Sequence, residues 1–349
     1  MSLLDIKGLQ TSFDTRAGTV RAIDGVDLQV DRGETVALVG ESGSGKSVTA
    51  YSILRLLPRG QGRITGGSIR FDGTELTTLP EAALRALRGN RISMIFQEPL
   101  SALNPVLSIG WQIVEAIRLH RRVGRREAWE QAVELLAHVG IPSPAQRALE
   151  HPHQLSGGMR QRAVIAIALA CEPELLIADE PTTALDVTTQ AQILELLQRL
   201  QAERGMGLLL ITHDLGVVAE VADRAAVMYA GRVVEQASVA ALFEAPAHPY
   251  TEGLLASLAI EALAPGTRLP EIAGTVPSLL EMPAGCAFAP RCGHASASCH
   301  AQRPEPHALD GHRVACHHPL VPFAPLAPLA PRAPLAAPAA PRQRAEAVA

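Results

Sequence analysis

Short apolar runs alternate with helical patterns over the first 240 residues of this 349-residue chain. Three continuous apolar runs, at 36–39, 175–178 and 208–211, are bounded by turn-forming or charged residues. Such runs are typical of strands buried on both faces, as in a parallel sheet covered by helices. The first ten residues alternate apolar and polar positions, which predicts a further strand.

Helical periodicity lies between these runs. Residues 187–204 carry apolar side chains at helical spacing, and Asp186 just before them is the expected N-cap. The apolar stretch 163–171 falls well short of the ~18–20 residues of a membrane-spanning helix and predicts a buried one. Together the strands and helices predict an α/β fold. The N-terminus lacks the pattern of a signal peptide, so we expect a cytosolic chain.

The pattern changes after about Leu258. Residues 259–318 are rich in Pro, Ala, His and Cys and have weak periodicity. From Pro319 to Pro334 proline recurs at every third position, which suits polyproline II and blocks both helix and sheet. We therefore expect a main domain over 1–258, a small domain over 259–318 and a disordered tail over 319–349.

Composition and charge narrow the function classes. A hydrophobic fraction of 47% excludes wholesale disorder, and a net charge of −4 excludes a broad electrostatic grip on nucleic acid. Only two of the 31 basic residues, Lys7 and Lys46, are lysines. In a chain that otherwise uses arginine, a lysine at position 46 indicates a local chemical requirement.

Lys46 lies in a phosphate-binding loop pattern, G-x-x-x-x-G-K-[ST], at residues 40–47. An apolar run precedes it and a helical stretch, 47–57, follows. Glycines let the loop point its N–H groups at phosphate oxygens, Lys46 supplies a compact charge, and Ser47 offers a hydroxyl to Mg²⁺. The expected nucleotide contacts are Gly40, Ser42, Gly43, Ser44, Gly45, Lys46 and Ser47.

Two further segments add chemistry. The run at 175–178 ends in Asp179 and Glu180; Asp179 is a candidate Mg²⁺ ligand and Glu180 a candidate general base for the attacking water. Ser156, Gly157 and Gly158 open an apolar helical stretch and form a second anion-binding helix start. Two such sites in one chain indicate two nucleotide sites, or one site closed by a second molecule.

These motifs resemble those of the ABC-transporter ATPase subunits. The phosphate loop, Gln97 in MIFQEP, LSGGM, LLIADEP, TALD and ITH follow one another in that family's order over roughly residues 1–245. The resemblance implies a P-loop NTPase core with an antiparallel β subdomain and a helical subdomain. It also implies that two subunits hold two ATP molecules between them, each site pairing one phosphate loop with the other chain's Ser-Gly-Gly.

The same resemblance assigns residue roles. Gln97 would sense Mg²⁺ and the γ-phosphate and link to the membrane subunits, and His213 would contact the γ-phosphate and steady the water. Asp186 would communicate across the dimer. Two positions depart from the family: Met159 replaces the usual glutamine after Ser-Gly-Gly, and Phe13, the expected adenine-stacking aromatic, is set back from the expected strand by residues 14–19.

Four cysteines lie within 31 residues near the end of the chain, at Cys286, Cys292, Cys299 and Cys316. In a reducing compartment clustered thiolates generally hold a metal, although this spacing does not match paired C-x₂-C zinc arms. Nearby histidines keep Zn²⁺ as an alternative. A fifth, Cys171, lies on an apolar helix and is expected to be an inert buried thiol.

A second resemblance concerns this region. PAHPYT at 246–251, followed by GCAFAPRC at 285–292 and the later cysteines, resembles the C-terminal extension of dipeptide and oligopeptide importers. In their D-type ATPase subunits such cysteines are associated with a [4Fe–4S] cluster, and four thiolates suit that cluster chemically. The resemblance implies a heterodimer with a second ATPase subunit, two membrane permeases, an extracytoplasmic peptide-binding protein, and a place on the cytoplasmic face of the membrane.

Three function classes are compatible with these motifs to different degrees. The favoured one is the energising subunit of a dipeptide or oligopeptide importer, with nickel complexes or another solute as the alternative cargo. A non-transport ABC ATPase acting on nucleic acid usually separates its motif halves by long heptad arms, and only 108 residues lie between Ser47 and Ser156. A non-catalytic module is disfavoured because Lys46, Asp179, Glu180 and His213 are all present.

Overall fold

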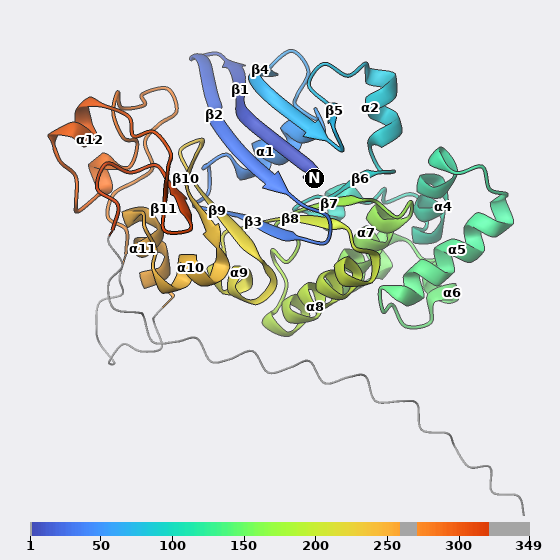
Figure 1. The fold of residues 1–349 in the computed structure, drawn as a ribbon. Coiled ribbons are helices and arrows are strands. Elements are labelled where there is room, and N and C mark those ends of the chain that lie inside the picture. The colour runs from blue at the N-terminus through green and yellow to red at the C-terminus, as the bar shows by residue number, and fades with distance from the viewer. Residues whose placement is uncertain (1, 259–270, 321–349) are drawn as a thin grey trace, which may run out of the picture.

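The structure is a computed structural model that describes residues 2–258 and 271–320. Its centre is an eight-stranded sheet in the order β11-β12-β10-β9-β3-β8-β7-β6 (Figure 1). Neighbours from β9 to β6 run parallel, and the strands beyond β9 are antiparallel. The bounds are β3 Thr35–Val39, β6 Ile92–Ile95, β7 Leu175–Asp179, β8 Gly207–Thr212, β9 Arg224–Tyr229 and β10 Arg232–Ser238.

A second, antiparallel sheet contains the first two strands of the chain. Its strands are ordered β2-β1-β4-β5, with β1 at Leu4–Thr15, β2 at Gly18–Val30, β4 at Gly62–Phe71 and β5 at Thr74–Glu75. Helix α1, Lys46–Ile53, lies beneath this sheet and carries buried Ala50 and Ile53 into the core shared by the two sheets. The loop between β3 and α1 thus connects the central sheet to this shared core.

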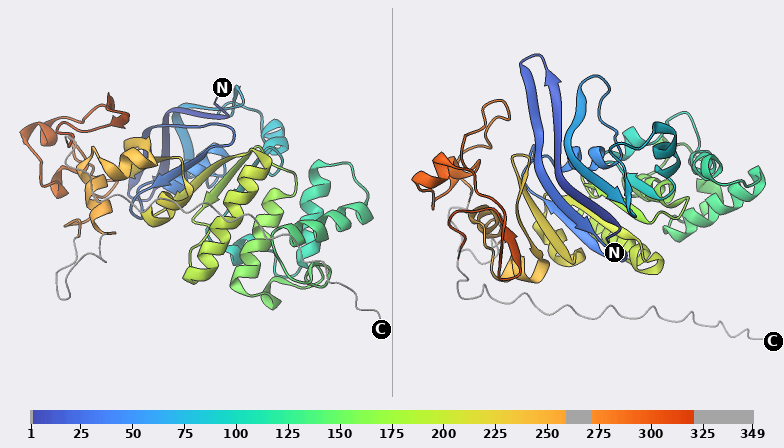
Figure 2. Two further views of the ribbon diagram at one scale, coloured as in Figure 1. Left: turned by 60° about the horizontal axis from the view of Figure 1, so that its bottom comes forward. Right: turned by 45° about the horizontal axis from the view of Figure 1, so that its top comes forward.

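Most of the described helices belong to one of two groups. One group covers the central sheet: α7 Gly157–Leu169, α8 Val187–Arg204, α9 Leu215–Val221, α10 Val239–Glu244 and α11 Pro249–Ala256. The other forms a helical subdomain at one end of the molecule, opposite residues 271–320 (Figure 2). Its elements are α3 Pro99–Ala102, α4 Ile109–His120, α5 Arg125–His138, α6 Pro144–Arg147 and the 3₁₀ turn Pro152–Gln154, while α2, Glu81–Leu87, follows β5.

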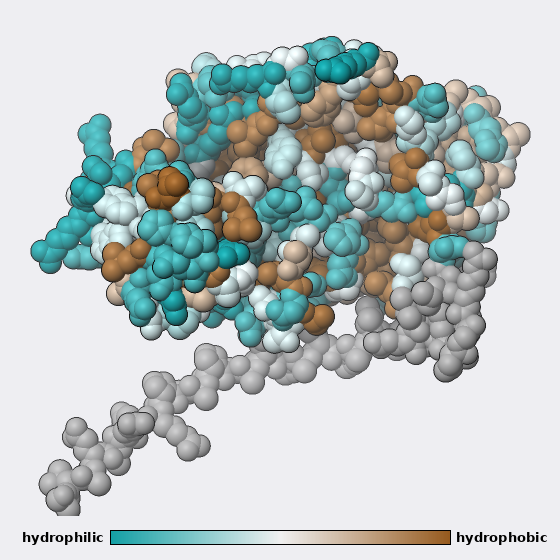
Figure 3. Space-filling view, turned by 180° about the vertical axis from the view of Figure 1, so that it is seen from behind, coloured by the Kyte–Doolittle hydropathy of each residue, from teal (hydrophilic) through white to brown (hydrophobic). Residues whose placement is uncertain are grey.

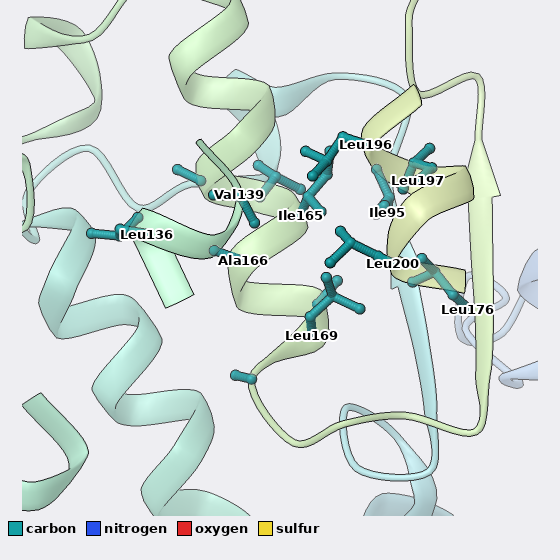
Figure 4. Packing of buried hydrophobic residues seen from close by; sticks show 14 of the residues in the cluster. Ile95, Leu136, Val139, Ile165, Ala166, Leu169, Leu176, Leu196, Leu197 and Leu200 are labelled. Atoms are coloured by element: carbon teal, nitrogen blue, oxygen red, sulfur yellow. The ribbon is translucent and has the colours of Figure 1, made fainter. Parts of the chain in front are cut away.

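The cores follow this division. One large apolar cluster joins α7 and α8 to the helical subdomain and to β6 and β7, as Figure 4 shows for Ile165, Leu169, Leu196 and Leu200 among others. On the surface, hydrophobic residues occur in separate patches among hydrophilic ones (Figure 3). Within the described residues no helix has both the length and the apolar character needed to cross a membrane.

Residues 271–320 pack directly onto the rest of the described chain. They contain a 3₁₀ turn at Ala289–Arg291, α12 at Ala297–Ala301, and the hairpin strands β11, His307–Leu309, and β12, His312–Val314. β12 pairs with β10 and so extends the central sheet. Asp310 and Gly311 both have positive φ, 44° and 83°, as a type I′ hairpin turn requires. The central sheet therefore contains strands from both sides of the boundary expected at residue 258.

The sequence predictions of α/β architecture, of the three buried strands and of the helix at 187–204 are confirmed. The helix expected at 47–57 is shorter, because it ends at Ile53 and Arg55 takes a left-handed φ of 49° before Pro58. Most of the tail expected at 319–349 lies outside the described residues. Leu320, which is described, donates its N–H to Ala247 O at 2.8 Å.

Candidate nucleotide site

The phosphate loop connects β3 to α1, as the sequence predicts. Gly40 and Gly45 have φ of 149° and 105°. A β-carbon at Gly40 would lie 2.2 Å from Met228 O, and one at Gly45 would lie 2.7 Å from Ile23 Cδ1. Both glycines are therefore required by backbone conformation and by close approach of neighbouring chain segments.

Lys46 lies inside the loop with its side chain directed back at it. The residue is 5% exposed, and Nζ donates to Gly40 O at 2.7 Å and to Glu41 O at 3.0 Å. Burial lowers its pKa, while the carboxylates of Glu180, Asp179 and Glu41 act in the opposite direction. The loop thus holds a compact ammonium that could meet an anion bound there.

The rest of the loop offers further contacts. Ser42 and Gly43 are exposed at its tip. Ser44 is buried, and its Oγ has no hydrogen-bond partner among the described residues. An unpaired buried hydroxyl is costly without a ligand, so this atom suits a phosphate oxygen.

Asp179 and Ser47 meet beside the loop. Ser47 Oγ donates to Asp179 Oδ1 at 3.0 Å across 132 residues of sequence. Asp179 is fully buried, and its Oδ2 has no partner in the described part of the chain. Burial raises the pKa of Asp179, although the Ser47 bond and Lys46 lower it. A carboxylate oxygen next to a serine hydroxyl is the donor set that Mg²⁺ prefers, so these residues fit the ion.

Glu180 is held by side chains from three segments. Gln97 Nε2 donates to Oε2 at 3.0 Å, Thr183 Oγ1 donates to the same oxygen at 2.9 Å, and His213 Nδ1 lies 3.3 Å from Oε1. Glu180 has a left-handed φ of 46°, which is rare for a residue with a β-carbon and is typical of functional sites. The structure therefore brings together Gln97, Glu180 and His213.

The Ser-Gly-Gly segment and Asp186 form helix starts. Ser156 is the N-cap of α7, with Oγ accepting from Met159 N at 3.3 Å. Ser156 and Gly157 are exposed. Asp186 is the N-cap of α8 and accepts from Thr189 N at 2.9 Å, which confirms the predicted cap. A β-carbon at Gly158 would lie 2.8 Å from Thr189 Cγ2, so the two helix starts touch.

Phe13 lies on β1, opposite Gly62 of β4. A β-carbon at Gly62 would lie 2.9 Å from Phe13 Cε1 and 3.0 Å from Leu57 Cβ, so the ring closes over the glycine. The ring is partly buried. One face of the Phe13 ring therefore packs against Gly62. The adenine-stacking role of Phe13 stays a prediction.

The four C-terminal cysteines line one small pocket together with His248, His294, His317 and His318. Burial raises the pKa of the Cys286 and Cys292 thiols, and that of Cys316 to about 11. The free space is 10 Å³, close to that of one water or one ion. Among the described residues, no three His, Cys, Asp or Glu side chains are arranged to hold a metal ion. The donors are gathered, but a four-iron cluster would require the loops to separate.

The sequence did not indicate the contacts of Glu41, the second residue of the phosphate loop. Its partners are Tyr250 on α11 and Arg291 in the 3₁₀ turn Ala289–Arg291. Tyr250 and Arg291 stood in the quoted importer-like segments. No spacing or periodicity linked them to a loop more than 200 residues away.

Family comparisons agree with this geometry. The model of the family "ABC transporter" matches residues 23–183, and that of "Oligopeptide/dipeptide transporter, C-terminal region" matches 234–299. The chain is 57% identical over 320 residues to a Brucella melitensis protein named "Putative peptide import ATP-binding protein", covering 89% of this chain and 95% of the relative. It is 52% identical over 303 residues to the oligopeptide transport ATP-binding protein AppD of Bacillus subtilis, covering 87% and 92%.

Solved structures give the same result for the fold. The ATP-binding cassette MJ0796, in a dimeric post-hydrolysis state bound to ADP and Pi, aligns with a TM-score of 0.61 at 29% identity and covers 68% of this chain and 98% of its own. CbiO1 of Clostridium perfringens, part of the cbiONQ ABC transporter complex, aligns with a TM-score of 0.59 at 28% identity and covers 69% and 90%.

Proposed function

The chain belongs to the ABC transporter ATP-binding subunits related to peptide importers, and on that premise we propose that it hydrolyses ATP to drive peptide import through membrane permeases. The observation that carries the proposal is the convergence of Ser47, Asp179 and Glu180 beside the phosphate loop. A dipeptide or oligopeptide is the cargo favoured by the C-terminal match, with nickel complexes or another solute as the alternative.

Each residue at the site has a chemical role. The loop N–H groups and Lys46 would bind the phosphates, while Ser47 Oγ and Asp179 Oδ2 would hold Mg²⁺, which would neutralise phosphate charge. Glu180 accepts the proton of the attacking water, and His213 orients its carboxylate. Gln97 donates to the other carboxylate oxygen and so reports the state of the site to the exposed segment that follows it.

A second ATPase subunit completes the site. Ser156 and Gly157 are exposed at the start of α7, where their N–H groups are free to meet a phosphate held by another chain. The related cassette MJ0796 was solved as a dimer. We expect a heterodimer, with Asp186 signalling across it, and therefore little hydrolysis by this chain alone.

The membrane partners would contact the segment after Gln97. Exposed apolar side chains are concentrated there, at Leu100, Val106 and Leu107. Next to it, a hollow of 350 Å³ is lined by Phe96, Leu119 and other residues. An apolar surface of this kind suits two permease subunits. We propose that the chain works on the cytoplasmic face of the inner membrane, with an extracytoplasmic peptide-binding protein as an indirect partner. No nucleic acid partner is proposed.

The cysteine pocket is proposed to bind metal through Cys286, Cys292, Cys299 and Cys316. Four thiols suit a [4Fe–4S] cluster, and the 10 Å³ of free space suits a single Zn²⁺ as the second candidate. A bound metal would keep the cysteines as thiolates and tie together the loops that carry them. We assign it a structural role.

Reconstitution tests the function. The chain is assembled in liposomes with two permeases and a second ATPase subunit of a peptide importer, and ATP turnover is measured with and without peptide and binding protein. We expect peptide-stimulated hydrolysis and peptide uptake, both abolished by Glu180→Gln. Hydrolysis that no peptide stimulates, but that a nickel complex does, would reassign the cargo.

A further inference from the structure

All three polar groups of Glu41, the second residue of the phosphate loop, are held by other residues. Its N–H donates to Tyr250 Oη at 2.9 Å, and its carbonyl accepts from Lys46 Nζ at 3.0 Å. Its carboxylate accepts from both terminal nitrogens of Arg291, at 2.6 and 3.0 Å. Two of these three partners lie more than 200 residues further along the chain: Tyr250 on α11 and Arg291 in the 3₁₀ turn Ala289–Arg291.

The Arg291 guanidinium is buried, and each of its nitrogens donates hydrogen bonds. The side chain is 4% exposed. Nε donates to Ala273 O at 3.0 Å, and the remaining donors reach Ile272 O at 3.1 Å and Tyr229 Oη at 3.3 Å. The rings of Tyr229 and Phe288 lie 5.7 and 6.0 Å from its central carbon. A buried guanidinium needs such partners, and a bidentate carboxylate contact fixes its geometry.

This pair acts on the phosphate site in two ways. Glu41 O is one of the two carbonyls that locate Lys46 Nζ, so a displaced Glu41 displaces the ammonium. The Glu41 carboxylate also lies close enough to Lys46 to influence its pKa, and unneutralised it would repel an incoming polyphosphate. Arg291 cancels that charge and fixes the loop before ATP arrives.

We propose that Arg291 is a positioning residue for ATP binding: its bidentate contact with Glu41 holds the phosphate loop in its binding conformation and neutralises the carboxylate beside it. The C-terminal region then completes the nucleotide site of its own chain. This inference rests on the proposed ATPase function.

The chain provides a matched control. Arg303 also joins the C-terminal region to the core, through Asp24 of β2 at 2.9 Å, and its side chain is 37% exposed. Its partner lies on β2, outside the loop. Removing the Arg303 contact therefore tests general attachment of the C-terminal region, whereas removing the Arg291 contact tests the loop.

The experiment measures equilibrium binding of MgATP to the full-length chain by displacement of a fluorescent ATP analogue. The variants are Arg291→Gln, Glu41→Gln, the double variant and Arg303→Gln, each checked by thermal unfolding. We expect Arg291→Gln to weaken binding at least about tenfold, and Arg303→Gln to leave it within about twofold. The double variant should bind more tightly than Arg291→Gln, because the uncompensated carboxylate is gone.

Equal affinities of Arg291→Gln and Arg303→Gln would overturn the inference, as would a double variant no tighter than Arg291→Gln. If Arg291→Gln fails to fold, Arg291→Lys replaces it, since lysine keeps the charge but forms no fork; wild-type affinity there would also overturn the inference. Absence of ATP binding by the wild-type chain would instead contradict the ATPase assignment.

Discussion

Glu180 Oε1 and His213 Nδ1 lie 3.3 Å apart just beyond the ends of two parallel neighbouring strands, β7 and β8. The register pairs Asp179 with Ile211, so each residue follows its strand at the same edge of the sheet. Because Gln97 and Thr183 hold the other carboxylate oxygen, Glu180 is oriented from both sides. The arrangement fits a general base with a fixed direction of proton acceptance.

Replacing Glu180 with Gln removes that base and keeps the volume. Turnover should fall by at least about 100-fold, while ATP binding persists and the closed dimer accumulates. Single-turnover hydrolysis and size-exclusion chromatography with ATP measure the two effects. Hydrolysis at the wild-type rate by this variant would show that Glu180 is not the general base.

Lys46→Arg should abolish most ATP binding although the charge is kept. Nζ fits between Gly40 O and Glu41 O at a position that is 5% exposed, and a planar guanidinium is too large for that space. We expect affinity for MgATP to fall at least about tenfold, measured by calorimetry. Lys7→Arg, at an exposed position of β1, is the control and should bind as wild type.

Metal content tests the cysteine pocket. Protein purified without oxygen should be brown and bleach with dithionite if it holds a [4Fe–4S] cluster, and be colourless with bound zinc if it holds a single ion. Cys316→Ser should lower the metal content severalfold. Cys171→Ser, which changes a buried thiol bonded to Ala116 O, should leave it unchanged. Wild-type protein with neither metal would refute the site.

Glu75 predicts a pH dependence of stability. Partial burial raises its pKa, but bonds from Ser68, Thr77 and Ile69 N outweigh this and lower the pKa to about 2. The folded state therefore favours the carboxylate, and this stabilisation is present above the unfolded pKa of 4.5 and lost as pH falls towards 2.

At pH 7, Glu75→Gln should lower the free energy of unfolding by about 2 kcal/mol, and the difference from wild type should shrink below pH 4.5. Urea titrations at several pH values measure it. Glu134→Gln, at an exposed position of α5, is the control. A difference that stays constant down to pH 2.5 would contradict the assignment.

The sequence predicted the parts of the fold that have strong local signals. The buried strands and the helix after Asp186 follow from periodicity and capping, and the phosphate loop follows from glycine spacing. The β11–β12 hairpin was missed because each strand has only three residues, although Asp310-Gly311 is a hairpin signal. The Arg291–Glu41 pair was beyond reach, because packing between distant segments creates it.

The pairing of β12 with β10 bears on how the chain can be shortened. β12 covers Glu235 and Gln236 on the outer edge of β10, and His312 donates to the buried Glu235 carboxylate at 2.8 Å. A truncation after residue 258 would bare that edge and remove a partner of a carboxylate that is sealed from water. We therefore expect a fragment that ends at residue 258 to be less stable than one that extends past Val314.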